Sequence, residues 1–310
     1  MARCSTSSRR VLMTEDKLYF SIDRSVDEVN SRIGKNSNPR LQNIMEVVVS
    51  HLHAAIKEVN LTTEEWMGAI QFLTETGQIC SDWRQEFILL SDVLGVSMLV
   101  DAINHQRPNG STENTVLGPF HVADAPHYPM GSNISLDGKG ESMLVSGQVV
   151  DIDGKPIAGA LLDVWQANDD GFYDVQQRGI QPEWNLRGVF RTGPDGKYWF
   201  KTTKPRWYPI PNDGPVGKLL EALDRHPNRP AHIHFIVTAP GHDTVVTHIF
   251  DPDCPFLSED PVFGVKTSLI ANIESVDDPD KAKQVGLSNP FLAIDWDFTL
   301  APLEKARVTA

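Results

Sequence analysis

The chain has 310 residues and a formal net charge of −13 at pH 7, from 28 basic and 41 acidic side chains. An anion of this size repels phosphate backbones and anionic lipid surfaces, so neither nucleic acid nor a membrane is an expected partner. Hydrophobic residues make up 40% and charged residues 22%, which excludes disordered and fibrous classes. No apolar run approaches the ~20 residues that span a bilayer, and the N-terminus lacks the apolar part of a secretion signal. A cytoplasmic protein is expected.

Three cysteines, Cys4, Cys80 and Cys254, lie far apart and are odd in number. This pattern argues against a disulfide framework and against a thiolate metal site. Any metal bound by this chain would therefore have oxygen and nitrogen ligands.

The first third of the chain has the spacing of helices. Apolar residues recur at intervals of three and four, the pattern of a helix with one apolar face. Thr62 and Glu65, three residues apart, can form a capping box at the start of the second helix. A polar stretch with Pro108 ends the helical region, which we place at residues 1–108. The predicted helices span about residues 41–60, 62–77 and 82–104.

Residues 109–310 alternate apolar and polar side chains between turns rich in Gly and Pro. Many short strands at close spacing predict an antiparallel β-sandwich. The chain has no alternation of strands with helices and no Gly-rich phosphate loop, so a nucleotide cofactor is not expected. Three hairpins are predicted: residues 145–149 with 157–164, 188–192 with 198–202, and 232–237 with 244–250.

The third hairpin carries a pair of histidines. His232 and His234 are two apart in a strand and so project from the same face, where two imidazoles can chelate one metal. The alternative is a chance pair of solvent-facing rings. If the turn is centred on Gly241, His248 lies opposite His234, and three imidazoles share the face. Arg229 stands just before this strand.

Two tyrosines lie in loops where burial of an aromatic hydroxyl needs a reason. Tyr173 follows the end of a predicted strand, and Tyr208 lies in a loop stiffened by prolines. Taken singly, each would more often be a packing residue with a hydrogen-bonded hydroxyl. Because a tyrosine oxygen can bind a metal, these residues taken alone leave open whether they are metal ligands.

Several motifs in the same order resemble the intradiol ring-cleavage dioxygenases. The likeness runs from the helical part to about residue 275. Residues 84–92 and 262–266 further resemble the branch of the family that cleaves hydroxyquinol (1,2,4-trihydroxybenzene), rather than the catechol or chlorocatechol branches. The motifs that carry the family likeness are Thr115-Val116-Leu117-Gly118-Pro119-Phe120, residues 159–173 with Trp165-Gln166-Ala167-Asn168, Tyr208-Pro209-Ile210-Pro211, and Arg229-Pro230-Ala231-His232-Ile233-His234.

The resemblance implies one non-haem Fe(III) per chain, held by Tyr173, Tyr208, His232 and His234. Phenolate is a hard anionic donor that suits ferric iron, and two phenolates with two neutral imidazoles offset most of its charge. Zinc is the alternative ion, but tyrosinate is a rare zinc donor. The expected reaction inserts both atoms of O2 into an aromatic diol or triol and yields a ring-opened dicarboxylic acid.

The resemblance also implies separate roles around the iron. Tyr208 would leave the metal and accept a substrate proton, whereas Tyr173 would stay bound. Arg229 would stabilise negative charge that develops during the reaction. His248 stands where catechol-cleaving relatives usually carry Gln, and either hydrogen-bonding support or passive packing could explain it.

The substrate pocket expected from the resemblance contains one carboxylate. Asp92 could accept a hydrogen bond from the third hydroxyl of hydroxyquinol, or it could instead cap or solvate its helix. The expected pocket residues are Leu89, Asp92, Val116, Leu117, Gly118, Pro119, Phe120, Ile210, Pro211, Arg229 and Val262.

For the helical region the resemblance implies a homodimer, often with a lipid in an apolar tunnel at the helical interface. The apolar helix faces are equally compatible with packing onto the sandwich. A non-catalytic β-sandwich binding protein is the alternative from another class, and it would be colourless because it would lack a ferric phenolate.

Overall fold

The computed structural model describes residues 19–34, 36–81 and 84–303. The described residues divide into two compact units between Leu73 and Thr74. Within the described residues, no helix is both long and apolar enough to cross a membrane.

The predicted first two helices are confirmed. After the short helix α1 (Ser25–Asn30), α2 spans Pro39–Glu58 and α3 spans Thr63–Gln78. The side chain of Asn38 caps α2 by accepting hydrogen bonds from two backbone N–H groups. The capping box at α3 forms as predicted, because the Glu65 carboxylate accepts from the Thr62 N–H at 2.8 Å while Thr62 Oγ1 accepts from the Glu65 N–H at 3.2 Å.

The third predicted helix is wrong as a single element. It is divided into α4 (Glu86–Val93) and α5 (Val96–Asn104), and its predicted start at Asp82 lies outside the described residues. Gly95, between the two helices, has a φ of 73°, a left-handed conformation that ends a helix and that glycine adopts without a steric cost. Apolar residues keep their helical spacing across the break at Gly95, so the sequence pattern does not reveal that the helix is interrupted.

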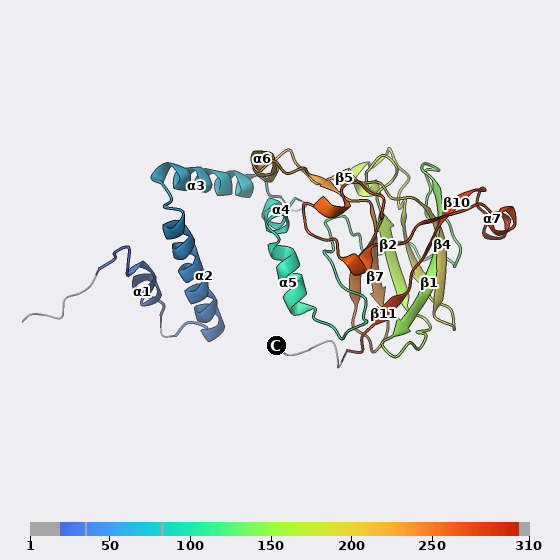
Figure 1. Cartoon of the computed structure of the whole chain (residues 1–310), viewed down its shortest axis with the longest axis horizontal. Helices are drawn as coiled ribbons and strands as arrows, with labels where there is room; N and C mark the ends of the chain where they lie inside the picture. The colour runs from blue at the N-terminus through green and yellow to red at the C-terminus, as the bar shows by residue number, and fades with distance from the viewer. Residues whose placement is uncertain (1–18, 35, 82–83, 304–310) are drawn as a thin grey trace, which may run out of the picture. The chain divides into compact units, whose positions relative to one another are not determined.

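Most strands belong to two sheets that lie as layers (Figure 1). The first contains β1 (Ser142–Asp151), β4 (Lys197–Thr203), β9 (Glu274–Val276), β10 (Phe291–Asp295) and β11 (Phe298–Leu300). The second has the order β3 (Arg187–Arg191), β2 (Leu161–Gln166), β7 (His232–Thr238) and β8 (Val245–Phe250). A small third sheet pairs β5 (Tyr208–Pro209) with β6 (Asn228–Arg229).

The core lies between the two larger sheets, which confirms the β-sandwich. Aromatic pairs bridge the layers, with ring centroids 4.8 Å apart for Phe190 and Phe200 and 4.9 Å apart for Phe235 and Phe298. The first sheet is mixed rather than wholly antiparallel, because β1 pairs in parallel with β10 and β11.

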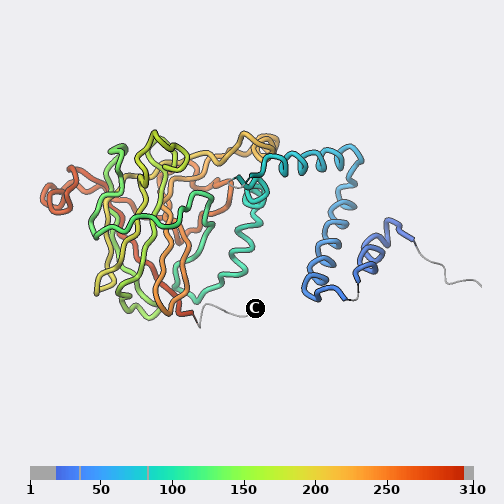
Figure 2. The backbone as a smooth tube through the Cα atoms, turned by 180° about the vertical axis from the view of Figure 1, so that it is seen from behind, coloured from blue at the N-terminus to red at the C-terminus, as the bar shows by residue number. Residues whose placement is uncertain are grey.

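Only the third predicted hairpin forms as two adjacent strands. There, β7 and β8 pair antiparallel with His234 opposite His248, as predicted. The other two predicted hairpins are wrong: β1 and β2 lie in different sheets, and so do β3 and β4. The chain reverses at both turns, and the strand that follows each turn belongs to the facing layer. Figure 2 draws the backbone as a continuous tube. Turn residues specify that the chain reverses direction. In a sandwich, the strand after the turn can then either pair with the strand before it or join the facing sheet.

The remaining elements are short. They are the helices α6 (Pro215–Ala222) and α7 (Pro279–Val285) and the 3₁₀ helices η1 (Asp174–Gln176), η2 (Leu257–Glu259) and η3 (Thr267–Leu269).

Candidate metal centre

The histidine pair lies on the outer face of the second sheet. Ile233 and Phe235 belong to the core between the sheets, so His232 and His234 project from the opposite face, as their spacing predicts. Both imidazoles are buried nonetheless, with 2% and 1% of their surface exposed. Loops that cover this face must therefore exclude water from the pair.

A row of side chains crosses the sheet at His234. The strand register places Arg187, Trp165, His234 and His248 in line across β3, β2, β7 and β8. The Trp165 indole stacks on the His234 imidazole with 4.5 Å between ring centroids and 11° between planes. These contacts leave the His234 ring little freedom to rotate, so its Nε2 is held in a fixed position.

Two loops bring the tyrosines to the histidines. Tyr173 directly precedes η1, and its N–H donates to the Gln176 side chain at 2.9 Å. Tyr208 in β5 pairs with Arg229 in β6. The loops approach closely at Gly171, where a Cβ would lie 3.1 Å from the Trp207 carbonyl oxygen, and its φ of +82° also suits glycine.

The polar atoms of the four predicted ligands converge. Tyr173 Oη lies 3.2 Å from Tyr208 Oη and 2.9 Å from His234 Nε2, and the two histidine Nε2 atoms are 3.0 Å apart. Donors of one first-row metal ion lie about 2.0–2.3 Å from it and hence roughly 3 Å from one another. The spacing of the four atoms therefore fits a single ion.

The protonation of the four candidate donors also fits a metal. The Nδ1 hydrogen of His232 donates to the Pro230 carbonyl at 2.6 Å, which leaves the Nε2 lone pair facing the other donors. Burial and the charge of Arg229 lower the pKa of His232 to about 3, and burial holds the pKa of His234 well below its usual value. Burial raises the pKa of Tyr173 well above its usual value. A phenolate at this position thus requires strong positive charge, which a trivalent cation supplies.

A buried ion pair lies behind Tyr173. Arg187 Nε donates to the Asp174 carboxylate at 2.6 Å, and both residues are buried. The Arg187 guanidinium carbon lies 6.0 Å from the centre of the Tyr173 ring. Its charge favours the phenolate form of Tyr173.

His248 packs against both histidines of the pair. Its ring stacks on His232 at 4.6 Å and meets His234 edge to face at 4.1 Å. A nitrogen from each of the three histidines lies within 4.8 Å of the others. Among the described residues neither ring nitrogen of His248 makes a hydrogen bond of good geometry, although the Val116 backbone is close enough to interact with the ring.

The predicted pocket residues fall into groups. Phe120 stacks on Tyr173 at 4.6 Å, and a Cβ at Gly118 would lie 3.1 Å from His234 Cε1, so both border the donors directly. Leu89, Val116, Ile210 and Val262 share one apolar cluster. Leu117, Pro119 and Pro211 are exposed.

Asp92 is the acidic member of the predicted pocket. Burial raises the pKa of its carboxyl, whereas Ser97 and the charge of Arg229 act to lower it. The carboxylate of Asp92 is therefore partly withdrawn from water and close enough to Arg229 to interact with its charge.

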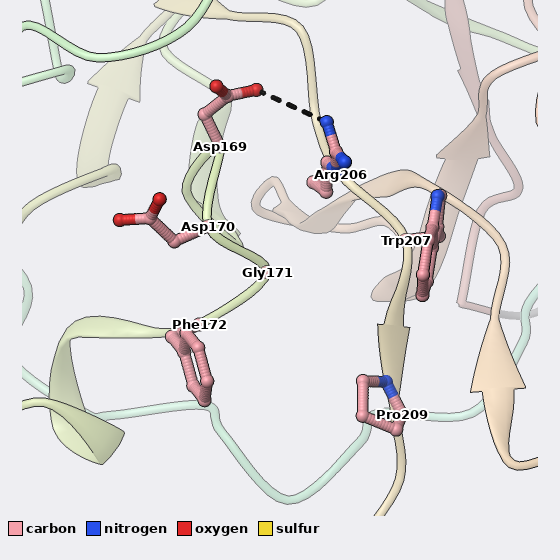
Figure 3. Close-up of a pocket in the computed structure, with 7 residues that line it drawn as sticks. All are labelled: Asp169, Asp170, Gly171, Phe172, Arg206, Trp207 and Pro209. Atoms are coloured by element: carbon pink, nitrogen blue, oxygen red, sulfur yellow. Dashed lines mark ion pairs between the residues drawn. The ribbon is translucent and has the colours of Figure 1, made fainter.

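A cavity of about 450 Å³ lies beside the two tyrosine loops, and Figure 3 shows the side chains that line it. Asp169 and Arg206 form an ion pair across it at 4.0 Å. Its lining includes neither tyrosine, although it includes their neighbours in the chain. The lining residues are Asp169, Asp170, Gly171, Phe172, Arg206, Trp207 and Pro209.

Nearly the whole chain matches known dioxygenases. Residues 38–112 match the family described as catechol dioxygenase N terminus, and residues 116–302 match the family described as dioxygenase. The chain belongs to the intradiol ring-cleavage dioxygenases.

Individual members of this family are similar to the chain over most of their length. A hydroxyquinol 1,2-dioxygenase from Rhizobium sp. (strain MTP-10005) is 62% identical over 93% of this chain and 98% of the relative. A catechol 1,2-dioxygenase from Candida albicans is 40% identical over 92% and 95%. The crystal structure of hydroxyquinol 1,2-dioxygenase from Pseudomonas putida DLL-E4 aligns with a TM-score of 0.84 and 46% identity, over 91% of this chain and 97% of that one.

As an intradiol dioxygenase, the protein is an enzyme whose family uses non-haem Fe(III), an aromatic substrate and O2. The described residues offer a cluster of histidines and tyrosines that suits this metal.

Sequence reasoning assigned no role to several residues of this intradiol dioxygenase site. Trp165 belongs to a quoted motif, but its stacking on His234 follows only from the pairing of β2 with β7, which the predicted hairpins did not contain. Asp260 makes an ion pair with Arg229. A buried arginine implies a carboxylate partner, but the sequence does not indicate which of 41 acidic residues it is.

Proposed function

We propose that this intradiol dioxygenase cleaves hydroxyquinol between its two adjacent hydroxyl-bearing carbons and inserts both atoms of O2 to give maleylacetate (3-hydroxy-cis,cis-muconate). The position of Asp92 carries the substrate assignment. Its partly buried carboxylate lies within electrostatic reach of Arg229 and can accept a hydrogen bond from a third hydroxyl, which catechol lacks. The 62% identity to a hydroxyquinol 1,2-dioxygenase supports the same substrate.

We propose that Tyr173, Tyr208, His232 and His234 hold one Fe(III) per chain. Bound ferric iron supplies Lewis acidity that draws electron density from a catecholic ring and makes the ring reactive towards O2. The supporting observation is that their four donor atoms converge while both histidines are held neutral.

Side chains of the protein carry out proton transfer, charge stabilisation and positioning of the histidine rings. Tyr208 accepts a proton from a substrate hydroxyl, and Tyr173 remains in place. Arg229 stabilises negative charge as it develops on the substrate. His248 keeps the rings of His232 and His234 in position through its contacts with both.

The remaining walls of the pocket set the orientation of the substrate ring. Apolar walls exclude water, which strengthens the interactions of Asp92 and Arg229 with the substrate. The walls we assign are Leu89, Val116, Leu117, Gly118, Pro119, Phe120, Ile210, Pro211 and Val262.

The two tyrosines should respond differently to loss of the hydroxyl. Tyr208→Phe should keep iron, because three donors remain, but show a shifted visible spectrum and slow turnover for lack of the proton acceptor. Tyr173→Phe should lose most visible absorption even with substrate bound. Iron analysis and absorption spectra of the two variants check this, and identical spectra would refute the division of roles.

Asp92 should control the preference between substrates. Catechol leaves the carboxylate desolvated and without its partner, at a cost of about 1–3 kcal/mol, so hydroxyquinol should be preferred roughly ten- to a hundredfold in kcat/KM. Asp92→Ala should reduce turnover of hydroxyquinol more than turnover of catechol and leave iron and colour intact. Both substrates are compared at one oxygen concentration. If the ratio of kcat/KM for hydroxyquinol to kcat/KM for catechol is unchanged in the variant, the enzyme would be assigned as a catechol or chlorocatechol 1,2-dioxygenase instead.

A non-catalytic binding protein is the alternative from a different class. It would require a decayed metal site, yet all four donor types are present and their atoms converge. We therefore give it second place.

We propose a homodimer formed through the helical region, with an amphipathic lipid at that interface. None of the 20 residues of α2 is buried in the described part of the single chain, and Val47, Leu52 and the capping residue Val59 are at least half exposed. Such apolar surface is commonly covered by a second subunit. Sedimentation at twice the chain mass, with lipid in an organic extract, is the expected result.

We assign residues 1–108 to the helical dimerisation region, which also contributes Leu89 and Asp92 to the pocket, and residues 109–310 to the catalytic domain. We also place the enzyme in the cytoplasm, which cell fractionation checks. Limited proteolysis should cut near the boundary and release a fragment that retains iron.

A further inference from the structure

The orientation of Arg229 is fixed by one carboxylate. Arg229 Nε lies 3.1 Å from Asp260 Oδ1 and Nη2 lies 3.2 Å from Asp260 Oδ2. The third guanidinium nitrogen, Nη1, is 3.5 Å from His232 Nε2. Because the guanidinium is planar and rigid, two contacts on one edge determine where the third nitrogen points. Asp260 therefore directs Nη1 towards the metal ligands.

The same carboxylate also holds a segment of the pocket wall. Asp260 Oδ2 accepts the Gly264 N–H at 2.9 Å, and Oδ1 accepts the Val262 N–H at 3.4 Å. The segment fits tightly, since a Cβ at Gly264 would lie 2.9 Å from Arg229 Nη2. The Thr115 hydroxyl holds the Gly264 end of this segment in place by donating a hydrogen bond to the Gly264 carbonyl at 2.7 Å.

A second arginine ties this segment to the helix that carries Asp92. Arg225 donates to the Val93 carbonyl at 2.7 Å and to the Pro261 carbonyl at 3.0 Å. The residues that follow Asp260 and the C-terminal end of α4 are thus connected through Arg225. A shift of the Asp260 carboxylate would move Arg229 and the wall at Val262 together.

We propose that Asp260 is a positioning residue for ring cleavage, which acts through Arg229 by fixing its third guanidinium nitrogen, Nη1, at the metal centre. Arg229 and Asp260 are 3% and 6% exposed, so solvent does not replace a lost contact. The proposal rests on the charge-stabilising role proposed for Arg229. It adds a residue that touches neither the substrate nor the four donors.

The test begins with Asp260→Asn, which keeps the shape of the side chain and removes its charge. The variant should retain iron and visible colour, because Asp260 is not a donor, and should bind substrate without oxygen with a normal spectral shift. Its kcat should fall about ten- to a hundredfold with little change in KM, as expected when a charge-assisted contact that matters in the transition state is lost. Each variant is assayed with whichever catecholic substrate the wild type turns over fastest, so an error in the hydroxyquinol assignment does not affect the result.

Asp243→Asn is the matched control. Asp243 makes a partly buried ion pair with Arg107 at 2.8 Å, just before β8 begins. Loss of that pair should leave kcat unchanged. Equal kcat values for Asp260→Asn and the control would overturn the proposal.

A double substitution separates action through Arg229 from a general effect on the fold. If Asp260 acts through Arg229, then Arg229→Met with Asp260→Asn should be no slower than Arg229→Met alone. An additional loss of the same size as in Asp260→Asn would overturn the proposal. If Asp260→Asn does not fold, Asp260→Glu is tested in its place. This variant keeps the charge but displaces the carboxylate by one methylene, so its kcat should also be low. A kcat equal to that of the wild type would overturn the proposal.

Discussion

Replacing His234 by alanine is expected to remove iron and visible colour together and to abolish ring cleavage. His234 Nε2 lies close to donor atoms of both Tyr173 and His232, so its loss opens the middle of the donor set. The vacated space would face the Trp165 indole, which offers no lone pair to a metal. Iron content per chain and the visible absorption spectrum measure the result.

His242→Ala is the control for this prediction. His242 is a partly exposed histidine at the turn of the same hairpin, where its Nδ1 lies 3.0 Å from the Pro240 carbonyl oxygen. Its removal should leave iron and colour unchanged. A His234→Ala protein with full iron and full colour would contradict the ligand assignment.

Replacing Arg229 by methionine is expected to slow turnover about a hundred- to a thousandfold, the usual loss when a preorganised charge-stabilising group is removed. The variant should also be less stable, by about 3–5 kcal/mol, because Asp260 remains buried without its cation. Iron should stay bound, since Arg229 is not a donor.

The stability loss in Arg229→Met should depend on pH. Burial raises the pKa of Asp260, but in the wild type the charge and hydrogen bonds of Arg229 outweigh burial and hold this pKa below its usual value. The ion pair therefore stabilises the fold above the unfolded-state pKa of Asp, and this stabilisation is lost as the pH falls through the lower folded-state value. In the variant burial outweighs the remaining hydrogen bonds from the Val262 and Gly264 N–H groups, so the folded-state pKa rises and the variant weakens as the pH rises. The difference in Tm between the two proteins should widen from pH 4 to pH 7, and a constant difference would contradict the account.

Local pattern was enough to predict the histidine face of the site. The two-residue period of β7 placed His232 and His234 together, and the turn at Gly241 set the register that brings His248 opposite His234. Both are properties of a single strand pair, so no knowledge of the rest of the fold was needed.

The crossings between sheets were not predictable in the same way. Turns near Gly154 and Gly196 mark reversals, yet the strands that follow them join the facing layer. Whether a strand pairs with its predecessor or packs against it depends on contacts with distant strands, such as β2 with β7. For this reason the sequence reasoning identified the strands and did not find Trp165 beside His234.

The ion pair between Asp260 and Arg229 also could not be predicted from the sequence. Its partner Arg229 is 31 residues away, and the segment between them contains β7, β8 and η2. Such an ion pair leaves no periodic signal in the sequence, and only the three-dimensional structure identifies it.

The visible spectrum of the purified enzyme tests the central claim most directly, recorded before and after hydroxyquinol is added in the absence of oxygen. We predict about one iron per chain, a wine-red absorption from phenolate-to-ferric charge transfer, and a shift of that band when hydroxyquinol binds. A colourless protein that contains iron, or a coloured protein whose spectrum hydroxyquinol does not change, would contradict a ferric centre built from Tyr173, Tyr208, His232 and His234.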